Sequence, residues 1–226
     1  MQAFILAGGK GERLRPLTET VPKPLIKLNK LALVEYWLEF FKKNGTTDLI
    51  IAVGHLGDKI VNHIGDGSKY GVRVRYTKEE QPLGTAGALR LAEDALADKF
   101  FMLNCDNILE PDLNRMEKEL ENAEGIIAGV QLADVSAGGS LITKNGYVEA
   151  FAEKSQQGPG IMSSGFYLLK KEILRRIPQG NVSIEKQVFP NMAKEGKLKV
   201  HTYSGRWSDV GTLERLEHAR KLFPES

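Results

Sequence analysis

The feature that most constrains the fold is a short apolar run near the N-terminus that ends in a cluster of glycines. Residues 4–7 read Phe-Ile-Leu-Ala, and Gly8, Gly9 and Gly11 follow almost at once. A continuous apolar run of this kind is typical of a strand buried on both faces of a parallel sheet. Glycines allow the main chain to turn sharply there and to bring its N–H groups close to a ligand. The sequence therefore predicts an α/β protein that binds a ligand beyond the end of its first strand.

The rest of the chain alternates between strand and helix patterns. Further strands are expected at residues 48–53, 72–76, 100–103, 126–132, 138–142, 147–153 and 161–169. Helices are expected from residue 31 to a stop signal at Gly45, and at residues 57–64, 84–96, 183–194 and 212–222. Strands that alternate with helices imply right-handed crossovers and a parallel sheet. We expect a Rossmann-like, mostly parallel sheet flanked by helices, in a single domain over residues 1–226 whose second half adds a smaller lobe to the same sheet.

Composition and charge exclude several classes of protein. The 226 residues carry a formal net charge of +2, which argues against nucleic-acid binding and against membrane attachment by charge. Cys105 is the one cysteine, so no intrachain disulfide forms. The apolar runs are shorter than the ~18 residues that span a bilayer, and the first lacks the basic segment of a signal peptide. We expect a cytoplasmic protein with no nucleic-acid or membrane partner; assembly into a homo-oligomer stays open.

Positive charge surrounds the glycine cluster. Lys10, Arg13 and Arg15 lie in or beside it, and Lys23 is held between two prolines. Arg13 can bind a phosphate through two donors, and the prolines orient the Lys23 ammonium at little entropic cost. The alternative is an ordinary β-turn with solvated lysines, which leaves the Pro-Lys-Pro segment unexplained. The loop is therefore a candidate phosphate site.

Two familiar phosphate loops do not match this segment. A Walker loop needs Ser or Thr after Gly-Lys, and here Lys10 is followed by Gly11. A dinucleotide fingerprint needs a third glycine where Leu14 stands. It also needs an acidic residue after the second strand, where this chain has Gly54 and His55. The phosphate loop is therefore of another kind.

The segment Gly-Gly-Lys-Gly-Glu-Arg-Leu at residues 8–14, followed by Pro-Lys-Pro at 22–24, resembles the nucleoside-triphosphate sugar-1-phosphate nucleotidyltransferases. The resemblance covers nearly the whole chain. It implies a mainly nucleotide-binding half at residues 1–110 and a mainly sugar-phosphate-binding half at 111–226. It also implies that the loop wraps the nucleotide phosphates and that Lys23 contacts phosphate directly. The nucleotide-binding residues implied in this way are Leu6, Ala7, Gly8, Gly9, Gly11, Arg13, Lys23, Gln81, Gly84 and Thr85.

The run Glu-Gln-Pro-Leu-Gly-Thr-Ala-Gly-Ala at residues 80–88 opens a helix after the third strand. Gln81 offers an amide donor and acceptor, and Gly84 permits close main-chain approach to a flat base. A helix start that uses small residues only for packing is the alternative. The resemblance implies that this run, including Thr85, contacts the nucleobase.

Asp106 stands just past the fourth strand, where a single aspartate is as often a helix cap as a ligand. The resemblance implies that Asp106 binds Mg²⁺ together with Asp209, which precedes Val-Gly-Thr. Two hard oxygen ligands suit Mg²⁺ when substrate phosphates complete its shell. Cys105 stands where a glycine is usual in the family, and we expect it to be packed rather than nucleophilic. The implied cofactor is Mg²⁺, and the implied catalytic residues are Arg13, Lys23 and Asp106.

Two later segments resemble the sugar-binding motifs of the same family. Glu153 and Lys154 stand where Glu-Lys-Pro is common, with Ser155 in place of the proline. Ser163 and Gly165 belong to a run that is usually Asn-Ala/Ser-Gly, with serine in place of the asparagine. The resemblance implies that Glu153 accepts hydrogen bonds from sugar hydroxyls and that Lys154 neutralises the sugar phosphate. The alternative for both is an exposed strand end.

The reaction class follows from the substrates' charge. A sugar-1-phosphate carries an anionic oxygen, so it can attack the α-phosphorus of a nucleoside triphosphate without a general base, and catalysis needs cations and positioning. Residues 160–169 and 183–190 look most like the D-glycero-α-D-manno-heptose-1-phosphate guanylyltransferases, which implies GTP as the donor. Mannose-1-phosphate guanylyltransferases and UTP- or dTTP-dependent hexose-1-phosphate nucleotidyltransferases are the alternatives. A non-catalytic nucleotide-sugar sensor is the rival from another class.

Overall fold

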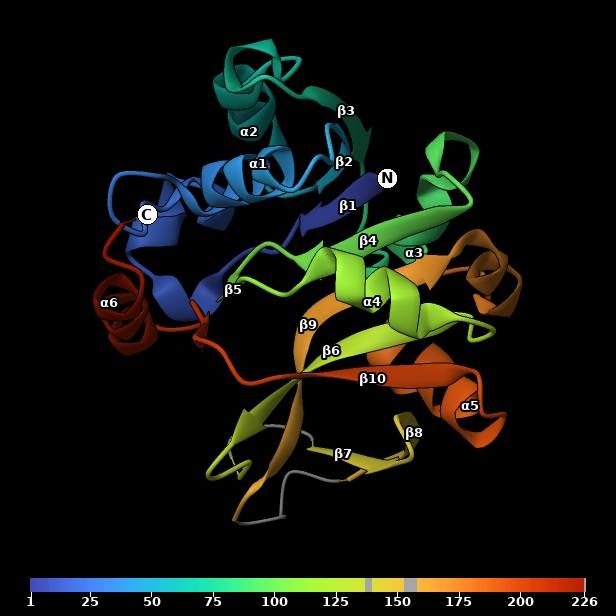
Figure 1. The fold of residues 1–226 in the computed structure, drawn as a ribbon. Helices are drawn as coiled ribbons and strands as arrows, with labels where there is room; N and C mark the ends of the chain where they lie inside the picture. The colour runs from blue at the N-terminus through green and yellow to red at the C-terminus, as the bar shows by residue number, and fades with distance from the viewer. Residues whose placement is uncertain (137–139, 153–157, 226) are drawn as a thin grey trace.

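One nine-stranded sheet runs through the molecule (Figure 1). The structure is a computed structural model that describes residues 1–136, 140–152 and 158–225. The strand order is β3-β2-β1-β4-β9-β6-β10-β8-β7, and β5 and β11 form a separate ribbon. The strands are β1 (Gln2–Ala7), β2 (Asp48–Val53), β3 (Arg73–Lys78), β4 (Lys99–Asn104), β5 (Asn107–Leu109), β6 (Gly125–Leu132), β7 (Ser140–Lys144), β8 (Tyr147–Phe151), β9 (Gly160–Lys170), β10 (Leu198–Tyr203) and β11 (Trp207–Asp209). The helices are α1 (Leu33–Lys43), α2 (Gly57–Ile64), α3 (Gly84–Leu91), α4 (Leu113–Leu120), α5 (Phe189–Lys194) and α6 (Leu213–Leu222).

The sheet has a parallel part and a mixed part. In the first half of the chain, β1 pairs in parallel with β2 and β4, and β2 pairs in parallel with β3. In the second half, β9 is antiparallel to both β4 and β6, whereas β10 is parallel to β6. β8 and β7 add antiparallel strands at the edge. The expected α/β fold is confirmed; the pairing is parallel throughout the first half of the chain and mostly antiparallel in the second half.

Strand β1 shows why the apolar run becomes a central strand. Alternate side chains of a strand point to opposite faces of the sheet, and the fully buried Phe4 and Ile5 belong to different hydrophobic clusters. Ile5 shares its cluster with Trp37 of α1, and Phe4 shares the other with Leu89 of α3. Each such buried side chain contributes roughly 1.5–3 kcal/mol. Helices therefore cover both faces of the sheet, with α4 in front and α3 and α5 behind in Figure 1.

The predicted helix at residues 84–96 is shorter in the structure. α3 ends at Leu91, and a 3₁₀ turn begins at Glu93. The Ala92 N–H donates to the Leu89 carbonyl, three residues back, which tightens the last turn. The acidic side chain of Glu93 would also oppose the negative end of a longer helix. The alanines and leucines of this run favour a helix, but the acidic residues after it do not.

Two other expectations are met in altered form. The predicted helix at residues 183–194 begins as a π-helical turn, Ile184–Val188, and continues as α5. The predicted strand at residues 138–142 is observed as β7, and the one at 147–153 as β8. Of those two predicted ranges, positions 138, 139 and 153 lie outside the residues that the structure describes.

Four elements have no counterpart among the expectations: β5, α4, β10 and β11. The start of α4 carried a signal, because the Asp112 carboxylate accepts a 3.0 Å hydrogen bond from the Arg115 N–H as an N-cap. β5 and β11 have three residues each and pair with one another. A strand of that length shows no period in the sequence, so only its pairing reveals it.

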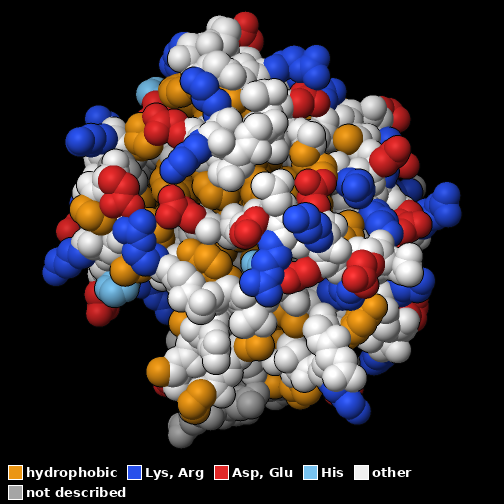
Figure 2. Space-filling model, in the orientation of Figure 1, with side chains coloured by type: hydrophobic (Ala, Val, Ile, Leu, Met, Phe, Trp, Pro, Cys, Tyr) orange, Lys and Arg blue, Asp and Glu red, His pale blue; other side chains and the backbone are white. Residues whose placement is uncertain are grey.

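The charged side chains are mixed over the surface. Figure 2 shows positive and negative side chains interspersed over one face of the molecule, as expected from a formal net charge of +2. No helix within the described ranges is long and apolar enough to cross a membrane.

Candidate active site

The glycine loop after β1 folds back onto the segment that carries Lys23. Gly11 has a φ of +64°, in the left-handed region that favours glycine. A Cβ there would lie 2.9 Å from Thr18 Cγ2 and 3.2 Å from Lys23 Cβ. The Thr18 hydroxyl donates a 2.8 Å hydrogen bond to the Gly11 carbonyl oxygen. Gly11 therefore shapes the loop from behind and does not line the pocket.

A pocket of about 640 Å³ lies beside this loop, at the carboxyl ends of β1 to β4. Those ends lie side by side because the parallel register places Ala7 opposite Val53, and Leu6 opposite Asn104. Open α/β sheets bind ligands at this edge. The predicted residues that line the pocket are Leu6, Ala7, Gly8, Gly9, Lys23, Gln81, Gly84, Thr85 and Asp106.

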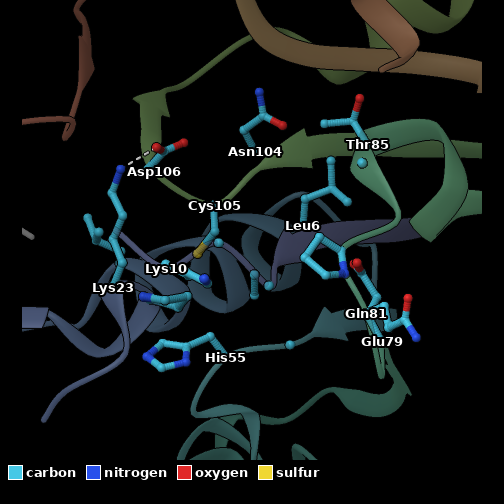
Figure 3. Close-up of a pocket in the computed structure, with 18 of the residues that line it drawn as sticks. Leu6, Lys10, Lys23, His55, Glu79, Gln81, Thr85, Asn104, Cys105 and Asp106 are labelled. Atoms are coloured by element: carbon cyan, nitrogen blue, oxygen red, sulfur yellow. Dashed lines mark hydrogen bonds and ion pairs between the residues drawn. The ribbon is translucent and has the colours of Figure 1, made fainter. Parts of the chain in front are cut away.

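Lys23 and Asp106 face each other at one end of the pocket, with Gln81 and Thr85 at the other end (Figure 3). The Lys23 ammonium and the Asp106 carboxylate form an ion pair. Lys23 opens a 3₁₀ turn, Lys23–Leu25, whose neighbouring prolines are buried. Its side chain is only 12% exposed, so water screens its charge weakly. The fold thus brings a positioned cation and a carboxylate to one point beside the glycine loop.

Asp209 lies close to Asp106 in the fold without lining the pocket. β11 pairs with β5 so that Asp209 stands opposite Asn107, and the Val210 N–H donates a 2.8 Å hydrogen bond to the Asp106 carbonyl oxygen. The Asp209 carboxylate accepts a 2.6 Å hydrogen bond from Arg215 Nη1. In the part of the chain that the structure describes, no group of three or more His, Cys, Asp or Glu forms a ready metal cluster.

The donor set nevertheless suits magnesium. Mg²⁺ commonly takes one or two protein carboxylates and completes its shell with water and substrate phosphates. Asp106 and Asp209 supply two carboxylates from neighbouring segments, and each is now neutralised by one basic side chain. These two aspartates are therefore the residues that would hold Mg²⁺.

Arg13 is exposed and lies outside the pocket lining. A Cβ on Gly211 would lie 3.0 Å from Arg13 Nη2, so the guanidinium rests against the chain just after Asp209. Positive charge from the glycine loop therefore extends to the segment that carries the second aspartate.

The predicted sugar-binding residues are placed less directly. Gly165 has a φ of +75°, and a Cβ there would lie 2.8 Å from Nδ2 of Asn104, which lines the pocket. The Gly165 N–H donates to the Ser163 hydroxyl at 3.5 Å, and neither residue lines the pocket itself. Glu153 and Lys154 lie outside the described residues. On β9, the glycine thus makes room for a pocket residue of β4.

The helix-opening run at residues 80–88 is held by a segment from the second half of the chain. Gly84 has a φ of +71°, and a Cβ there would lie 2.5 Å from the Val182 carbonyl oxygen. The Val182 N–H donates to the Leu83 carbonyl at 2.8 Å, and the Val182 carbonyl accepts from the Ala86 N–H at 2.9 Å. The sequence analysis predicts that Gly84 admits a base; in the structure its missing side chain makes room for Val182.

Cys105 lines the pocket and is 3% exposed. Burial raises the pKa of its thiol well above the ordinary value, so the thiol stays protonated at neutral pH. The expectation that Cys105 is a packed residue rather than a nucleophile agrees with this environment.

Three polar residues of the pocket lining escaped the sequence analysis, and each stands at a strand end. His55 and Glu79 stand just after β2 and β3, and Asn104 ends β4. Glu79 also shapes the pocket, because its Oε2 accepts a 2.9 Å hydrogen bond from the Leu83 N–H. The rule that ligands bind beyond the carboxyl ends of parallel strands points to these positions when it is applied to all four strands.

The glycine loop, Lys23 and Asp106 lie around one pocket, and Asp209 lies beside Asp106. Comparison with known protein families gives a result that agrees with this arrangement. The profile of the nucleotidyl transferase family matches residues 2–225. The chain therefore belongs to the nucleotidyl transferase family.

The similar curated proteins carry more specific names. The chain is 37% identical over 221 residues to mannose-1-phosphate guanyltransferase beta-A of Xenopus laevis, covering 93% of this chain and 61% of that protein. It is 36% identical over 237 residues to probable mannose-1-phosphate guanylyltransferase 1 of Oryza sativa subsp. japonica, covering 100% and 65%. The chain thus spans less than two thirds of the length of these curated relatives.

Solved structures share the fold over almost the whole chain. HddC from Yersinia pseudotuberculosis matches with a TM-score of 0.88 at 28% identity, over 98% of this chain and 99% of that one. The same protein complexed with GMP-PN matches with a TM-score of 0.87. A putative glucose-1-phosphate thymidylyltransferase from Bacillus anthracis matches with a TM-score of 0.88 at 25% identity, over 98% and 95%.

Proposed function

We propose that this protein transfers a nucleotidyl group from a nucleoside triphosphate to a sugar-1-phosphate and releases pyrophosphate. Family membership supports the reaction class. The observation that carries the proposal is the Lys23–Asp106 pair at the end of a strand-edge pocket, beside a glycine loop. This arrangement offers main-chain N–H groups, a cation and a carboxylate to a phosphate chain that reaches this end of the pocket.

The chemistry needs positioning and charge neutralisation. An oxygen of the sugar phosphate forms a bond to the α-phosphorus while the bond from that phosphorus to the pyrophosphate oxygen breaks. No proton has to be removed from the attacking oxygen, so no side chain acts as general base. The barrier comes from repulsion between two anionic reactants and from their alignment, and fixed donors reduce both.

The residues have distinct parts in this scheme. Main-chain N–H groups of Gly8 and Gly9 and the Lys23 ammonium bind the triphosphate, and Arg13 adds positive charge nearby. Gln81 and the main chain at Gly84 contact the base. When bound between Asp106 and Asp209, Mg²⁺ would supply further neutralisation of the phosphate charge.

We further propose GTP as the donor and mannose 1-phosphate as the favoured acceptor. The names of the curated relatives and the GMP-PN complex of HddC support guanine. Those names also favour mannose 1-phosphate, which was the alternative from the sequence, over the heptose phosphate that local resemblance put first. The proposal assigns residues 1–110 mainly to the nucleotide and 111–226 mainly to the sugar phosphate, with Glu153, Lys154, Ser163 and Gly165 at the sugar.

A substrate matrix tests the proposal. Pyrophosphate release is measured with Mg²⁺, each of four nucleoside triphosphates, and the 1-phosphates of mannose, glucose, N-acetylglucosamine and the manno-heptose. We expect the highest kcat/KM with GTP and mannose 1-phosphate. If the pocket has room for the extra carbon of the heptose, the transition-state free energies for the heptose and mannose phosphates should differ by only ~1–3 kcal/mol. The heptose phosphate therefore serves as a close competitor. A preference for UTP or dTTP with glucose 1-phosphate would overturn the substrate pair, and nucleotide binding without turnover would indicate a sensor.

A further inference from the structure

Residues 82–87 of the first half of the chain pack against residues 180–185 of the second half, and we call this contact the seam. Residues 82–87 and 180–185 contact each other through the two main-chain hydrogen bonds of Val182 and through Asn181 Nδ2, which donates to the Pro82 carbonyl at 3.0 Å. A Cβ on Gly87 would lie 2.7 Å from the Gly180 carbonyl oxygen. The two segments therefore pack too closely to admit even a methyl group at that glycine.

Glu185 lies at the end of this seam and receives three hydroxyl groups. The Thr85 hydroxyl donates to its Oε2 at 2.8 Å, the Ser183 hydroxyl to the same oxygen at 2.9 Å, and the Tyr167 hydroxyl to Oε1 at 3.2 Å. Among the side chains that the structure describes, no basic group forms an ion pair with this carboxylate. Its negative charge is thus held by hydroxyl donors alone.

The hydroxyl groups of Thr85 and Tyr167 are fixed as donors to Glu185. Thr85 Oγ1 accepts a 2.8 Å hydrogen bond from the Ile184 N–H, which leaves its proton for the carboxylate. Tyr167 is 1% exposed, and burial raises the pKa of its phenol, so the phenol keeps its proton. Glu185 therefore joins a residue that lines the pocket, Thr85, to a buried residue of β9, Tyr167.

The local helix does not need Glu185 for its own end. A glutamate near a helix start ordinarily supports the exposed N–H groups there. Here the Ser183 hydroxyl accepts from the Lys186 N–H at 3.3 Å, and Gln187 Oε1 accepts from the Ser183 N–H at 2.8 Å. The N–H groups of Ser183 and Lys186 thus have acceptors other than Glu185, and the carboxylate of Glu185 accepts from the seam instead. The turn at Ile184–Val188 is π-helical, a feature common at functional sites.

We propose that Glu185 is a positioning residue for the nucleotide site: it locks the loop of Gln81 to Thr85 onto β9. The inference rests on the proposed function for the identity of the ligand. Loss of the carboxylate frees the Thr85 edge of the pocket, so nucleotide binding weakens. Tyr167 does not line the pocket, so its hydroxyl can act on the Thr85 edge through the hydrogen bond to Glu185.

The first experiment measures binding of a non-hydrolysable GTP analogue by calorimetry to Glu185→Ala and Glu185→Gln. Because hydrogen bonds to a charged group are lost, we expect Glu185→Ala to raise Kd about tenfold and the isosteric Glu185→Gln to raise it less. Lys186→Ala is the matched control, since Lys186 is exposed on the same turn, and it should leave Kd unchanged. A merely structural role would lower Tm and the active fraction without changing Kd of the folded protein.

A double-mutant cycle tests the lock itself. Thr85→Val removes the donor and Glu185→Ala removes the acceptor of the same hydrogen bond, so their effects on Kd should not add. Tyr167→Phe should raise Kd by a smaller factor in a protein that folds normally. An unchanged Kd in Glu185→Ala, or fully additive effects in the cycle, overturns the inference. A wild-type protein that binds none of the four nucleoside triphosphates overturns the proposed function instead, and the inference with it.

Discussion

The parallel half and the mixed half of the sheet bring residues to the pocket in different ways. In the parallel half, β1 to β4 end at one edge, and the residue that follows each strand lines the pocket: Gly8, Gly54, Glu79 and Cys105. In the mixed half, most neighbouring strands run in opposite directions, so the strands do not all end at one edge. Its contributions come from inside a strand, as with Gly165 of β9, or through a short ribbon, as with Asp209 of β11. Strand direction alone therefore locates the first set, and pairing locates the second.

Removing the two aspartates is the strongest test of whether the halves share one site. We expect Asp106→Ala and Asp209→Ala each to abolish most turnover, at a cost of several kcal/mol in the barrier, because both carboxylates would hold Mg²⁺. Steady-state kinetics at saturating Mg²⁺ measure this. Asp58→Ala, in an exposed pair with Lys78, is the control and should retain normal rates. Near-normal turnover in Asp209→Ala alone would confine the chemistry to the parallel half.

Two lysines of the parallel half should differ sharply. We expect Lys23→Ala to lower kcat/KM by a factor that corresponds to about 2–4 kcal/mol of transition-state stabilisation, because a positioned donor is lost. Lys10 is exposed and lies in the glycine run, so Lys10→Ala should cost less than about 1 kcal/mol. Measuring kcat/KM of both variants under the same conditions tests this difference. Equal losses would mean that the prolines around Lys23 do not position it.

A glycine substitution tests the mixed half. Gly165→Ala places a methyl group at a φ of +75°, 2.8 Å from Asn104 Nδ2, and should lower the free energy of unfolding by about 1–3 kcal/mol. Gly9→Ala is the matched variant in the parallel half, because a Cβ there has nothing within 4 Å. Denaturant titration compares them. If Gly165→Ala were as stable as Gly9→Ala, β9 would not need glycine to accommodate the pocket residue.

The smallest effect concerns a carboxylate of the mixed half away from the pocket. The hydrogen bonds from Arg176 to Glu124 hold the pKa of that carboxyl below its usual value. A depressed folded pKa contributes stability above the unfolded pKa of about 4.3, and that stability is lost as the pH falls through the folded pKa. Glu124→Gln should therefore cost about 1 kcal/mol at pH 7 and much less below about pH 4. Urea titrations across this pH range measure the free energy of unfolding of the wild-type protein and of Glu124→Gln. If the difference between them did not become smaller in acid, the ion pair would be excluded as its cause.

Much of the nucleotide side was accessible from the sequence. The apolar run before Gly8, the stop after each buried strand and the prolines around Lys23 are local signals, and they gave the strands and most of the pocket lining. The sequence analysis missed His55, Glu79 and Asn104. These residues lie at strand ends, where the rule that ligands bind beyond the carboxyl ends of parallel strands also applies. Local signals failed for β5 and β11, whose three residues have no period of their own.

By itself, the sequence determined the elements whose cause is local: buried strands from continuous apolar runs, sharp turns from glycine, and a lysine restrained by its neighbouring prolines. Only the tertiary structure decided which distant segments meet. The ribbon of β5 and β11 brings Asp209 beside Asp106, and the seam makes Glu185 a partner of Thr85 and Tyr167. Hydrogen bonds between residues about a hundred positions apart leave no period in the chain, because they arise from the register of strands and the packing of loops.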